Sequence, residues 1–567
     1  MSRLFEEHVK REVKSLNGAW LMLKDECDIG CKLGYEKGLA GARTVIVPSV
    51  WNSEISMLDY EGVVWYEKQF YTKGGTLRFT FGSVMTYAKV YLDGELLGEH
   101  YGGFCKFAFL KNEVSEGYHK LIVRVDNRFD KYSIPHATVD WYHYGGITRD
   151  VEIESLSGIS VLYSQLDYSI DNDRADCKLK VTLYNSCNDE TTDVVWANVD
   201  GEEVANKKVT LSAKEESVIT LEFKLCDIKR WSAKTPNLYS LVTETSTDDL
   251  CDRVGFRTLE VRDKKILING EALILCGINR HEDNPDFGMA LPKLLMAKDL
   301  EIIENMNCNS IRGSHYPNDP VFVDMLDERG IYFWSEIPLW GSEYTGELYQ
   351  DEFFFSRAMK MHEEMVREYY NHPSIIIWGI LNENDTREEG TRIFTESCYK
   401  YLKKEGGNRL VTFATNKINK DICLKNCDFI SLNMYVGWYP YSDAAFETWE
   451  RALDTMDSYF EEVGVSDKPV VMSEFGAAAI YGHHTFDNLK GTEEYQAKLI
   501  SDCLDLFLSR DGYVGTYVWQ YCDVRTSAEM GLSRSRSYNN KGVLNEYRRP
   551  KLAYGVVKDF YEKALNK

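Results

Sequence analysis

Two glutamates stand where short apolar segments of the chain end. Glu383 follows the run 375–381 and Asn382, and Glu474 follows the run 469–473. Both runs are too short for ordinary helices and the first is rich in β-branched residues, so they predict strands buried on both faces. In a barrel of parallel strands and helices, a carboxylate directly after a strand lies at the catalytic mouth. Two carboxylates that flank a sugar can break a glycosidic bond, one by protonating the leaving oxygen and the other by attacking the sugar.

Other polar and aromatic side chains follow the remaining predicted strands and are expected at the same mouth. They are Asn279, Arg280, His281, His315, Tyr316, Asn416, Asn433, Tyr435, Trp519 and Asp523. Glu336 and Glu282 are competing candidates for the catalytic carboxylates. The set lacks a Ser-His-Asp arrangement, a phosphate-binding glycine loop and a clear group of metal ligands. We therefore expect neither a metal nor another cofactor.

The elements that must position these residues change character near residue 258. Residues 1–157 contain short alternating runs, one of which ends in the turn pair Asp93-Gly94, and predict a β-sandwich of jelly-roll type. Residues 158–258 continue to alternate and predict an immunoglobulin-like β-sandwich. Residues 259–567 alternate apolar runs with amphipathic ones, which indicates a C-terminal (β/α)8 TIM barrel. The expected fold class is thus a multidomain β plus α/β protein.

Eight strands are predicted in the barrel, at residues 273–277, 310–312, 331–334, 375–381, 410–414, 429–432, 470–473 and 514–519. Helices are expected between them, among others at residues 292–305, 353–370, 443–463 and 492–508. The helical pattern after the fifth strand is the weakest.

The charge and the composition exclude several classes of partner. The net charge of −23 argues against nucleic acid and against an anionic membrane. No stretch approaches the ~18 apolar residues of a membrane-spanning helix, and the first residues lack the apolar segment of a signal peptide. The 14 cysteines are scattered, which favours a cytoplasmic chain with reduced thiols. A negatively charged ligand would need a locally positive site.

Two longer segments resemble the signatures of the family-two glycoside hydrolases. One is residues 309–317, which read Asn-Ser-Ile-Arg-Gly-Ser-His-Tyr-Pro, and the other runs from Asn371 to Glu383. The resemblance covers essentially the whole chain, including the order of jelly roll, immunoglobulin-like domain and barrel. It implies a retaining mechanism, with Glu383 as acid/base and Glu474 as nucleophile.

Within that family, the chain is most similar to bacterial β-glucuronidases. The similar segments are residues 433–439, which include Asn433 and Tyr439, residues 473–476, and the sequence Asn539-Asn540-Lys541-Gly542. The last fits a motif whose asparagine and lysine grip a sugar carboxylate, and an amide and an ammonium are suitable donors for that group.

The resemblance also implies roles for other residues. Asp140 would reach the distal hydroxyls of the sugar, Asn382 would bond its 2-hydroxyl, Tyr435 would hold the nucleophile and Trp519 would form the floor of the pocket. His281 and His315 would bond the sugar or the catalytic groups. The family's arginine before the Asn-x-Lys motif falls between Arg534 and Arg536, and we expect Arg536 to fill that role.

These observations predict an exo-acting retaining β-glucuronidase that acts on small-molecule β-glucuronides, and a homo-oligomer, either a dimer or a tetramer. A β-galacturonidase or a hybrid uronidase is the alternative, because the two sugars share the carboxylate and differ at the 4-hydroxyl. A β-galactosidase, or a carbohydrate-binding protein without activity, is less favoured.

Overall fold

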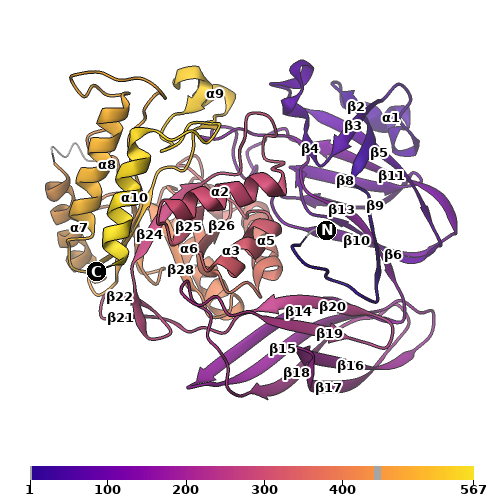
Figure 1. The fold of residues 1–567 in the computed structure, drawn as a ribbon. Coiled ribbons are helices and arrows are strands. Elements are labelled where there is room, and N and C mark those ends of the chain that lie inside the picture. Colours follow the sequence, from indigo (N-terminus) through magenta and orange to yellow (C-terminus); the bar gives the residue numbers. More distant parts are fainter. Residues whose placement is uncertain (1–2, 440–447, 567) are drawn as a thin grey trace.

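The computed structural model describes residues 3–439 and 448–566. Figure 1 shows two β-rich parts, drawn in indigo and magenta, beside a barrel that the chain enters after about half its length. The predicted fold class is confirmed. The limits 1–157, 158–258 and 259–567 stay predictions. No helix among the described residues is long and apolar enough to cross a membrane.

The first part is a sandwich of two main antiparallel sheets. One has the order β1-β13-β6-β10 and the other β3-β2-β5-β11-β8-β9. The bounds are β1 Glu12–Ser15, β2 Gly18–Asp25, β3 Arg43–Val47, β5 Val63–Thr72, β6 Gly75–Phe81, β8 Tyr87–Leu92, β9 Glu95–Tyr101, β10 Phe107–Val114, β11 Gly117–Asp126 and β13 Val151–Leu156. Apolar side chains of alternate residues, such as Phe79 and Phe81 of β6 and Val123 of β11, fill the space between the sheets.

The predicted Asp-Gly turn is confirmed. It joins β8 to β9, and Asp93 and Gly94 both have positive φ, at 51° and 89°. Positive φ at both central residues is the geometry of the hairpin turn that matches strand twist, which explains this residue pair.

The second part is a smaller sandwich. Its sheets have the orders β14-β15-β18 and β17-β16-β19-β20. The bounds are β14 Ile159–Asp171, β15 Arg174–Asn185, β16 Thr191–Val199, β17 Glu202–Leu211, β18 Glu216–Leu225, β19 Tyr239–Glu244 and β20 Asp249–Val254. The strand β15 alternates between exposed and buried positions along its length, as expected for a sheet with one face toward a core.

Eight parallel strands close the barrel in chain order. They are β24 Leu275–Arg280, β25 Ser310–Gly313, β26 Tyr332–Glu336, β27 Ile375–Asn382, β28 Leu410–Thr415, β29 Ile430–Asn433, β30 Val470–Phe475 and β31 Tyr513–Val518. Each overlaps a predicted strand. The side chains of β27 are all buried, because the barrel interior covers one face and helices cover the other.

The main helices of the barrel are α2 Lys293–Asn305, α3 Pro320–Arg329, α5 Glu352–Tyr369, α6 Glu389–Glu405, α7 Trp449–Val463, α8 Glu493–Phe507 and α10 Leu552–Leu565. The residues between β28 and β29, all of them described, form turns and no helix, where the predicted helix was weakest. The helix predicted at 443–463 is α7, and the first five residues of that prediction lie outside the described residues.

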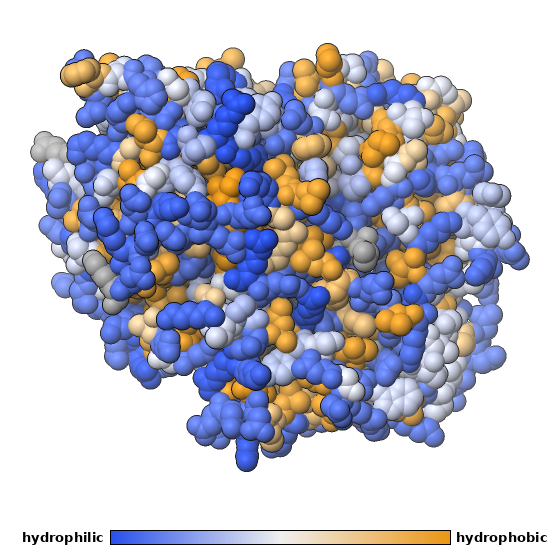
Figure 2. All heavy atoms as spheres, viewed as in Figure 1, coloured by the Kyte–Doolittle hydropathy of each residue, from blue (hydrophilic) through white to orange (hydrophobic). Residues whose placement is uncertain are grey.

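The loop between β11 and β12 (Gly146–Ile147) carries the first domain to the barrel mouth. Its Val139, Trp141 and Tyr144 pack in one buried cluster with Tyr316 and Met289 of the barrel. Arg149 strengthens the junction, because its guanidinium donates to Glu282 Oε2 at 3.1 Å and to the Pro317 carbonyl at 3.0 Å. The competing acid Glu282 is therefore part of a domain junction. In the view of Figure 1, the molecular surface carries mainly hydrophilic side chains, with apolar ones among them (Figure 2).

Candidate active site

Glu383 stands directly after β27, in a backbone conformation that few residues adopt. Its φ is 55°, and its amide donates to the Ala414 carbonyl at 2.9 Å, beyond the last regular pair of the strand. Left-handed backbone in a residue other than glycine is costly and is concentrated at functional sites. The turn directs the carboxylate into the mouth, where Asn433 Nδ2 donates to Glu383 Oε1 at 2.8 Å.

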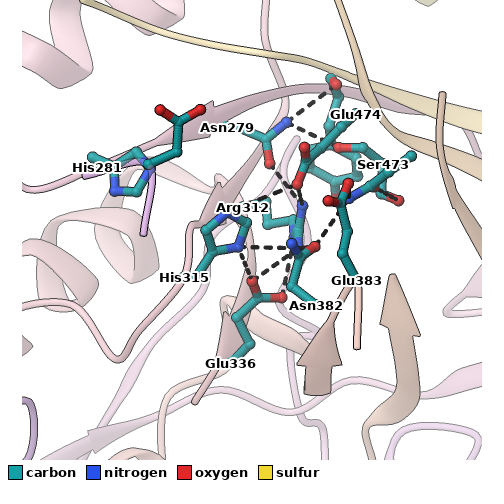
Figure 3. Close-up of polar contacts among 12 residues, drawn as sticks. Asn279, His281, Arg312, His315, Glu336, Asn382, Glu383, Ser473 and Glu474 are labelled. Carbon is teal, nitrogen blue, oxygen red and sulfur yellow. Dashed lines mark hydrogen bonds and ion pairs between the residues drawn. The ribbon is translucent and has the colours of Figure 1, made fainter. Parts of the chain in front are cut away.

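Glu474 lies within β30 and its carboxylate faces Glu383 across the mouth (Figure 3). Only 4% of the residue is exposed. Arg312 Nη1 donates to Glu474 Oε1 at 2.8 Å, and the Tyr435 hydroxyl donates to Oε2 at 2.8 Å. Both oxygens thus have a donor, which is the arrangement that orients an ionised carboxylate for attack.

The two carboxyl groups differ in their electrostatic surroundings. Burial raises the pKa of both Glu383 and Glu474. At Glu474 the guanidinium of Arg312, which is directly hydrogen-bonded, opposes this rise. At Glu383 the hydrogen bond from the neutral amide of Asn433 opposes it, together with the charges of Lys417 and Arg312. Because the two carboxyl groups disfavour each other's ionisation, the pair favours a single negative charge, and the direct bond from a charged donor favours that charge on Glu474. This is the division of roles that a retaining acid/base pair needs.

Arg312 is a central residue of the site that the sequence analysis did not single out. It lies in the buried strand β25 and donates to Glu336 Oε1 at 2.8 Å and to Asn382 Oδ1 at 2.7 Å, besides Glu474. Glu336 is fully buried and serves as the counter-ion of this network. An arginine within a short buried strand was the available signal, since such a charge must be paired inside the barrel.

Asn382, next to Glu383 in the chain, has an unused amide donor. Its Oδ1 accepts from Arg312 and, at 3.0 Å, from Asn433 Nδ2, which fixes the amide orientation. Its buried Nδ2 has no hydrogen-bond partner among the described residues. Since buried polar groups in folded proteins are almost always hydrogen-bonded, this amide is available to donate to a ligand oxygen such as a sugar hydroxyl.

The two predicted histidines lie side by side against aromatic rings. The His315 ring is stacked on Trp519 with centroids 5.1 Å apart, and the His281 ring meets Trp519 edge-on at 5.5 Å. His315 Nδ1 lies 2.7 Å from Glu336 Oε1, while its Nε2 and that of His281 are buried and have no hydrogen-bond partner among the described residues. Burial lowers the pKa of both imidazoles, so they are neutral hydrogen-bonding groups near pH 7.

One part of the pocket is built from segments that lie far apart in the sequence. Asp140 comes from the first domain, and its Oδ2 accepts from Arg534 Nη2 at 2.6 Å and from Asn539 Nδ2 at 2.9 Å. Lys541 Nζ donates to the Tyr439 hydroxyl at 2.6 Å, and Arg534 also approaches that hydroxyl, at 3.3 Å. Asp140, Arg534, Asn539, Lys541 and Tyr439 therefore form one polar wall.

Arg534 and Arg536, which flank the position expected for the family's arginine, have different surroundings in the structure. Arg534 lines the same cavity as Glu383 and Glu474. Arg536 is bound instead to Glu546 Oε1 at 2.8 Å and to Asn540 Oδ1 at 3.0 Å, and 44% of its side chain is exposed. Its backbone is left-handed, with a φ of 61°, and its side chain is not among those that line the cavity.

These groups enclose a cavity of about 460 Å³. Asp140, Tyr439, Arg534 and Lys541 of the polar wall line this cavity together with both carboxylates. Apolar side chains, including Ile418, Val436 and Met530, line another part of it. A cavity of this size and polarity can hold one sugar ring between the carboxylates and the wall, with an attached group beside the apolar residues.

One cluster of potential metal ligands lies elsewhere, at Asp324, Asp327 and His372, whose ligand atoms are within 4.8 Å of one another. Its carboxylates already accept from protein groups: Asp324 from Arg3 at 2.8 Å, and Asp327 from the amide of Ser374 at 2.9 Å. The cluster is therefore a structural network that ties the N-terminal segment to α3.

Comparison with known proteins finds relatives of this architecture. Residues 259–566 match the family Glycosyl hydrolases family 2, TIM barrel domain, and residues 161–257 match Glycosyl hydrolases family 2. A β-galacturonidase of Eisenbergiella tayi, solved with galacturonate, is 34% identical with a TM-score of 0.92, and the match covers 99% of both chains.

The β-glucuronidase of Ruminococcus gnavus is 26% identical with a TM-score of 0.87, again over 99% of both chains. The β-glucuronidase of Paenibacillus borealis is 25% identical over 98% of this chain and 97% of its own.

Proposed function

Since this chain belongs to family 2 of the glycosyl hydrolases, we propose that it is a retaining exo-acting β-glucuronidase, which releases glucuronate from small-molecule β-glucuronides. The observation that carries this proposal is that Lys541 is buried and has no carboxylate partner among the described residues. The residue is 1% exposed, and the hydrogen bond of its ammonium goes to the neutral phenol of Tyr439. Across residues 3–439 and 448–566, no carboxylate lies within ion-pair distance of that ammonium.

A buried ammonium without a counter-ion is costly, and a bound carboxylate would remove that cost. The neighbouring cation does not compete for this role, because Arg534 is already paired with Asp140. Among the described residues, one positive charge of the wall therefore has no carboxylate partner, in a chain whose net charge is −23. A uronic acid supplies a single carboxylate on the carbon farthest from the scissile bond, which suits a cation that lines the same cavity as the two carboxylates.

The reaction follows from the geometry. With the sugar carboxylate on Lys541, the ring lies between Glu474 and Glu383, and Asn382 Nδ2 is free to bond the 2-hydroxyl. The Glu474 carboxylate attacks the anomeric carbon while Glu383 gives its proton to the leaving oxygen. Glu383 then takes a proton from a water molecule whose oxygen attacks the anomeric carbon, which breaks the bond to Glu474 and releases the sugar with retained configuration.

The wall also limits how the substrate binds. Arg534 and Asn539 both donate to Asp140, and in this proposal the bonded group stops a second sugar from binding beyond the first. We infer that the enzyme removes a terminal uronic acid. In this arrangement Arg534, and not Arg536, is the arginine that contacts the sugar, because it lines the cavity.

A β-galacturonidase is the second candidate. The structure of the Eisenbergiella tayi β-galacturonidase is 34% identical to this chain, against 26% for the Ruminococcus gnavus β-glucuronidase. Lys541 and Asn539 do not separate the two sugars, because the carboxylate is common to both. The groups that would distinguish the 4-hydroxyl are those at the polar wall, above all Asp140 and Arg534.

Four aryl glycosides with the same leaving group test the proposal: the β-glucuronide, β-galacturonide, β-glucoside and β-galactoside. We expect the highest kcat/KM for the glucuronide, and both uronides well above the neutral sugars. A higher value for the galacturonide would favour the second candidate. Equal turnover of uronides and neutral sugars would refute a uronidase of either kind. The expected homo-oligomer and the cytoplasmic location stay predictions.

A further inference from the structure

The loop that carries Asn539 and Lys541 is held by side chains that do not themselves reach the pocket. The carbonyl of Asn540 accepts from the Ala479 amide at 2.9 Å and from Lys551 Nζ at 3.1 Å. The carbonyls of Lys541 and Gly542 accept from Gln496 Nε2 at 3.2 and 3.0 Å. The backbone on either side of the Lys541 side chain is thus fixed by partners from outside the loop.

Asp523 and Lys551 form the centre of this support. Both side chains are fully buried, and Lys551 Nζ donates to Asp523 Oδ1 at 2.7 Å. The same Oδ1 accepts from the Gly542 amide at 3.0 Å, and Lys551 Nζ also donates to the Ala479 carbonyl at 2.7 Å. One ion pair therefore links the segment after β31, the segment after β30 and the loop.

The loop backbone also packs closely on the segment that contains Asp523. A Cβ atom placed on Gly542 would lie 2.3 Å from the Asp523 amide nitrogen and 2.4 Å from the Leu544 carbonyl oxygen. No other residue fits there without a backbone shift. The position of the loop is thus set by contact as well as by hydrogen bonds.

We propose that the buried pair Asp523–Lys551 is a positioning device for the anion-binding loop, which holds the Lys541 ammonium where the uronate carboxylate binds. This inference rests on the proposed function. Asp523 and Lys551 are positioning residues, since their described partners are protein groups. They act on the uronate carboxylate through the backbone of residues 539–542. A displacement of about 1 Å in such a support is enough to cost up to ~10²-fold in rate, so the pair should affect uronides far more than neutral sugars.

The test uses Asp523→Asn, which removes the charge but retains an acceptor, and Lys551→Met. The double variant Asp523→Asn/Lys551→Met removes both charges and leaves no lone buried charge, so it keeps the test valid if a single variant folds poorly.

Asp428→Asn is the matched control. Asp428 Oδ2 likewise accepts from a lysine, Lys403 Nζ at 2.9 Å, and from a backbone amide, that of Val411 at 2.7 Å, but it precedes β29 and so lies at the opposite end of the barrel strands.

The readout is the ratio of kcat/KM for the aryl glucuronide to that for the aryl glucoside, with the melting temperature measured for each variant. We expect Asp523→Asn, Lys551→Met and the double variant each to lower this ratio by about tenfold. Asp428→Asn should lower the melting temperature and leave the ratio within about twofold of wild type.

A second comparison isolates the route of the effect. If Asp523 acts through Lys541, then Asp523→Asn should change the ratio by less than about twofold once Lys541 is already alanine. A full additional loss in that background would overturn the inference, as would equal losses on both substrates in the Asp523 and Lys551 variants. A wild-type ratio near one would refute the proposed function instead.

Discussion

Replacement of Lys541 by alanine should selectively reduce turnover of uronides. In the part of the chain that the structure describes, no carboxylate pairs with the Lys541 ammonium of the polar wall, which lies 2.6 Å from the phenol oxygen of Tyr439. A hydrogen bond to a charged group contributes about 1.5–3 kcal/mol. Since 1.4 kcal/mol corresponds to tenfold, kcat/KM for the aryl glucuronide should fall by roughly one to two decades. Much of the loss should appear in kcat, because a contact remote from the reacting carbon holds that carbon in line.

The assay compares Lys541→Ala with wild type on two substrates that have the same leaving group. The aryl glucoside lacks the carboxylate, so its slower turnover should change little or rise. The ratio of the two kcat/KM values cancels any general loss of folded enzyme. Lys541→Met is a useful companion, because it keeps most of the apolar stem against Tyr435 and Tyr439 while removing the charge. If Lys541→Ala lowers both substrates equally, the residue has a structural role only, and the reasoning from its missing counter-ion is wrong.

Three further predictions follow from the same geometry. Azide should rescue Glu474→Gly and give the glycosyl azide of inverted configuration. It should also rescue Glu383→Ala, with a product of retained configuration. If product analysis by NMR shows the opposite pairing, the two roles are reversed. Burial raises the pKa of Glu383, whose protonated form is the acid, so activity should fall as the pH rises through that pKa. In Glu383→Gln this basic limb should disappear for a substrate with a poor leaving group, and a pH profile with the limb intact would mean that another group is the acid. Arg534→Ala should lower kcat/KM for the glucuronide by about tenfold, because it frees Asp140, whereas Arg536→Ala should cost less; the reverse order would restore Arg536 to the sugar site.

The sequence alone was sufficient to predict the barrel and to place Glu383 and Glu474 at the ends of its strands. Strand burial leaves a local pattern, since a strand covered on both faces must be apolar along its length, and the run 375–381 shows this plainly. The end of such a run is equally local, so Glu383 and Glu474 could be placed at the mouth before any contact was known. The same holds for Asp93 and Gly94, whose residue types follow from the turn they make.

The tertiary structure alone decided which distant groups meet at that mouth. Asp140 and Arg534 are 394 positions apart in the chain, and Arg312 is 162 positions from Glu474. No periodicity relates such pairs, because their contact depends on how a domain loop and several barrel strands converge. Arg534 and Arg536 are two positions apart, and sequence favoured the second. In the folded chain Arg534 lines the cavity, whereas Arg536, with a left-handed backbone, is bonded to Glu546 and Asn540 outside it. That no described residue supplies a counter-ion to Lys541 is likewise a property of the folded chain, because a charge is unpaired only relative to what surrounds it in space.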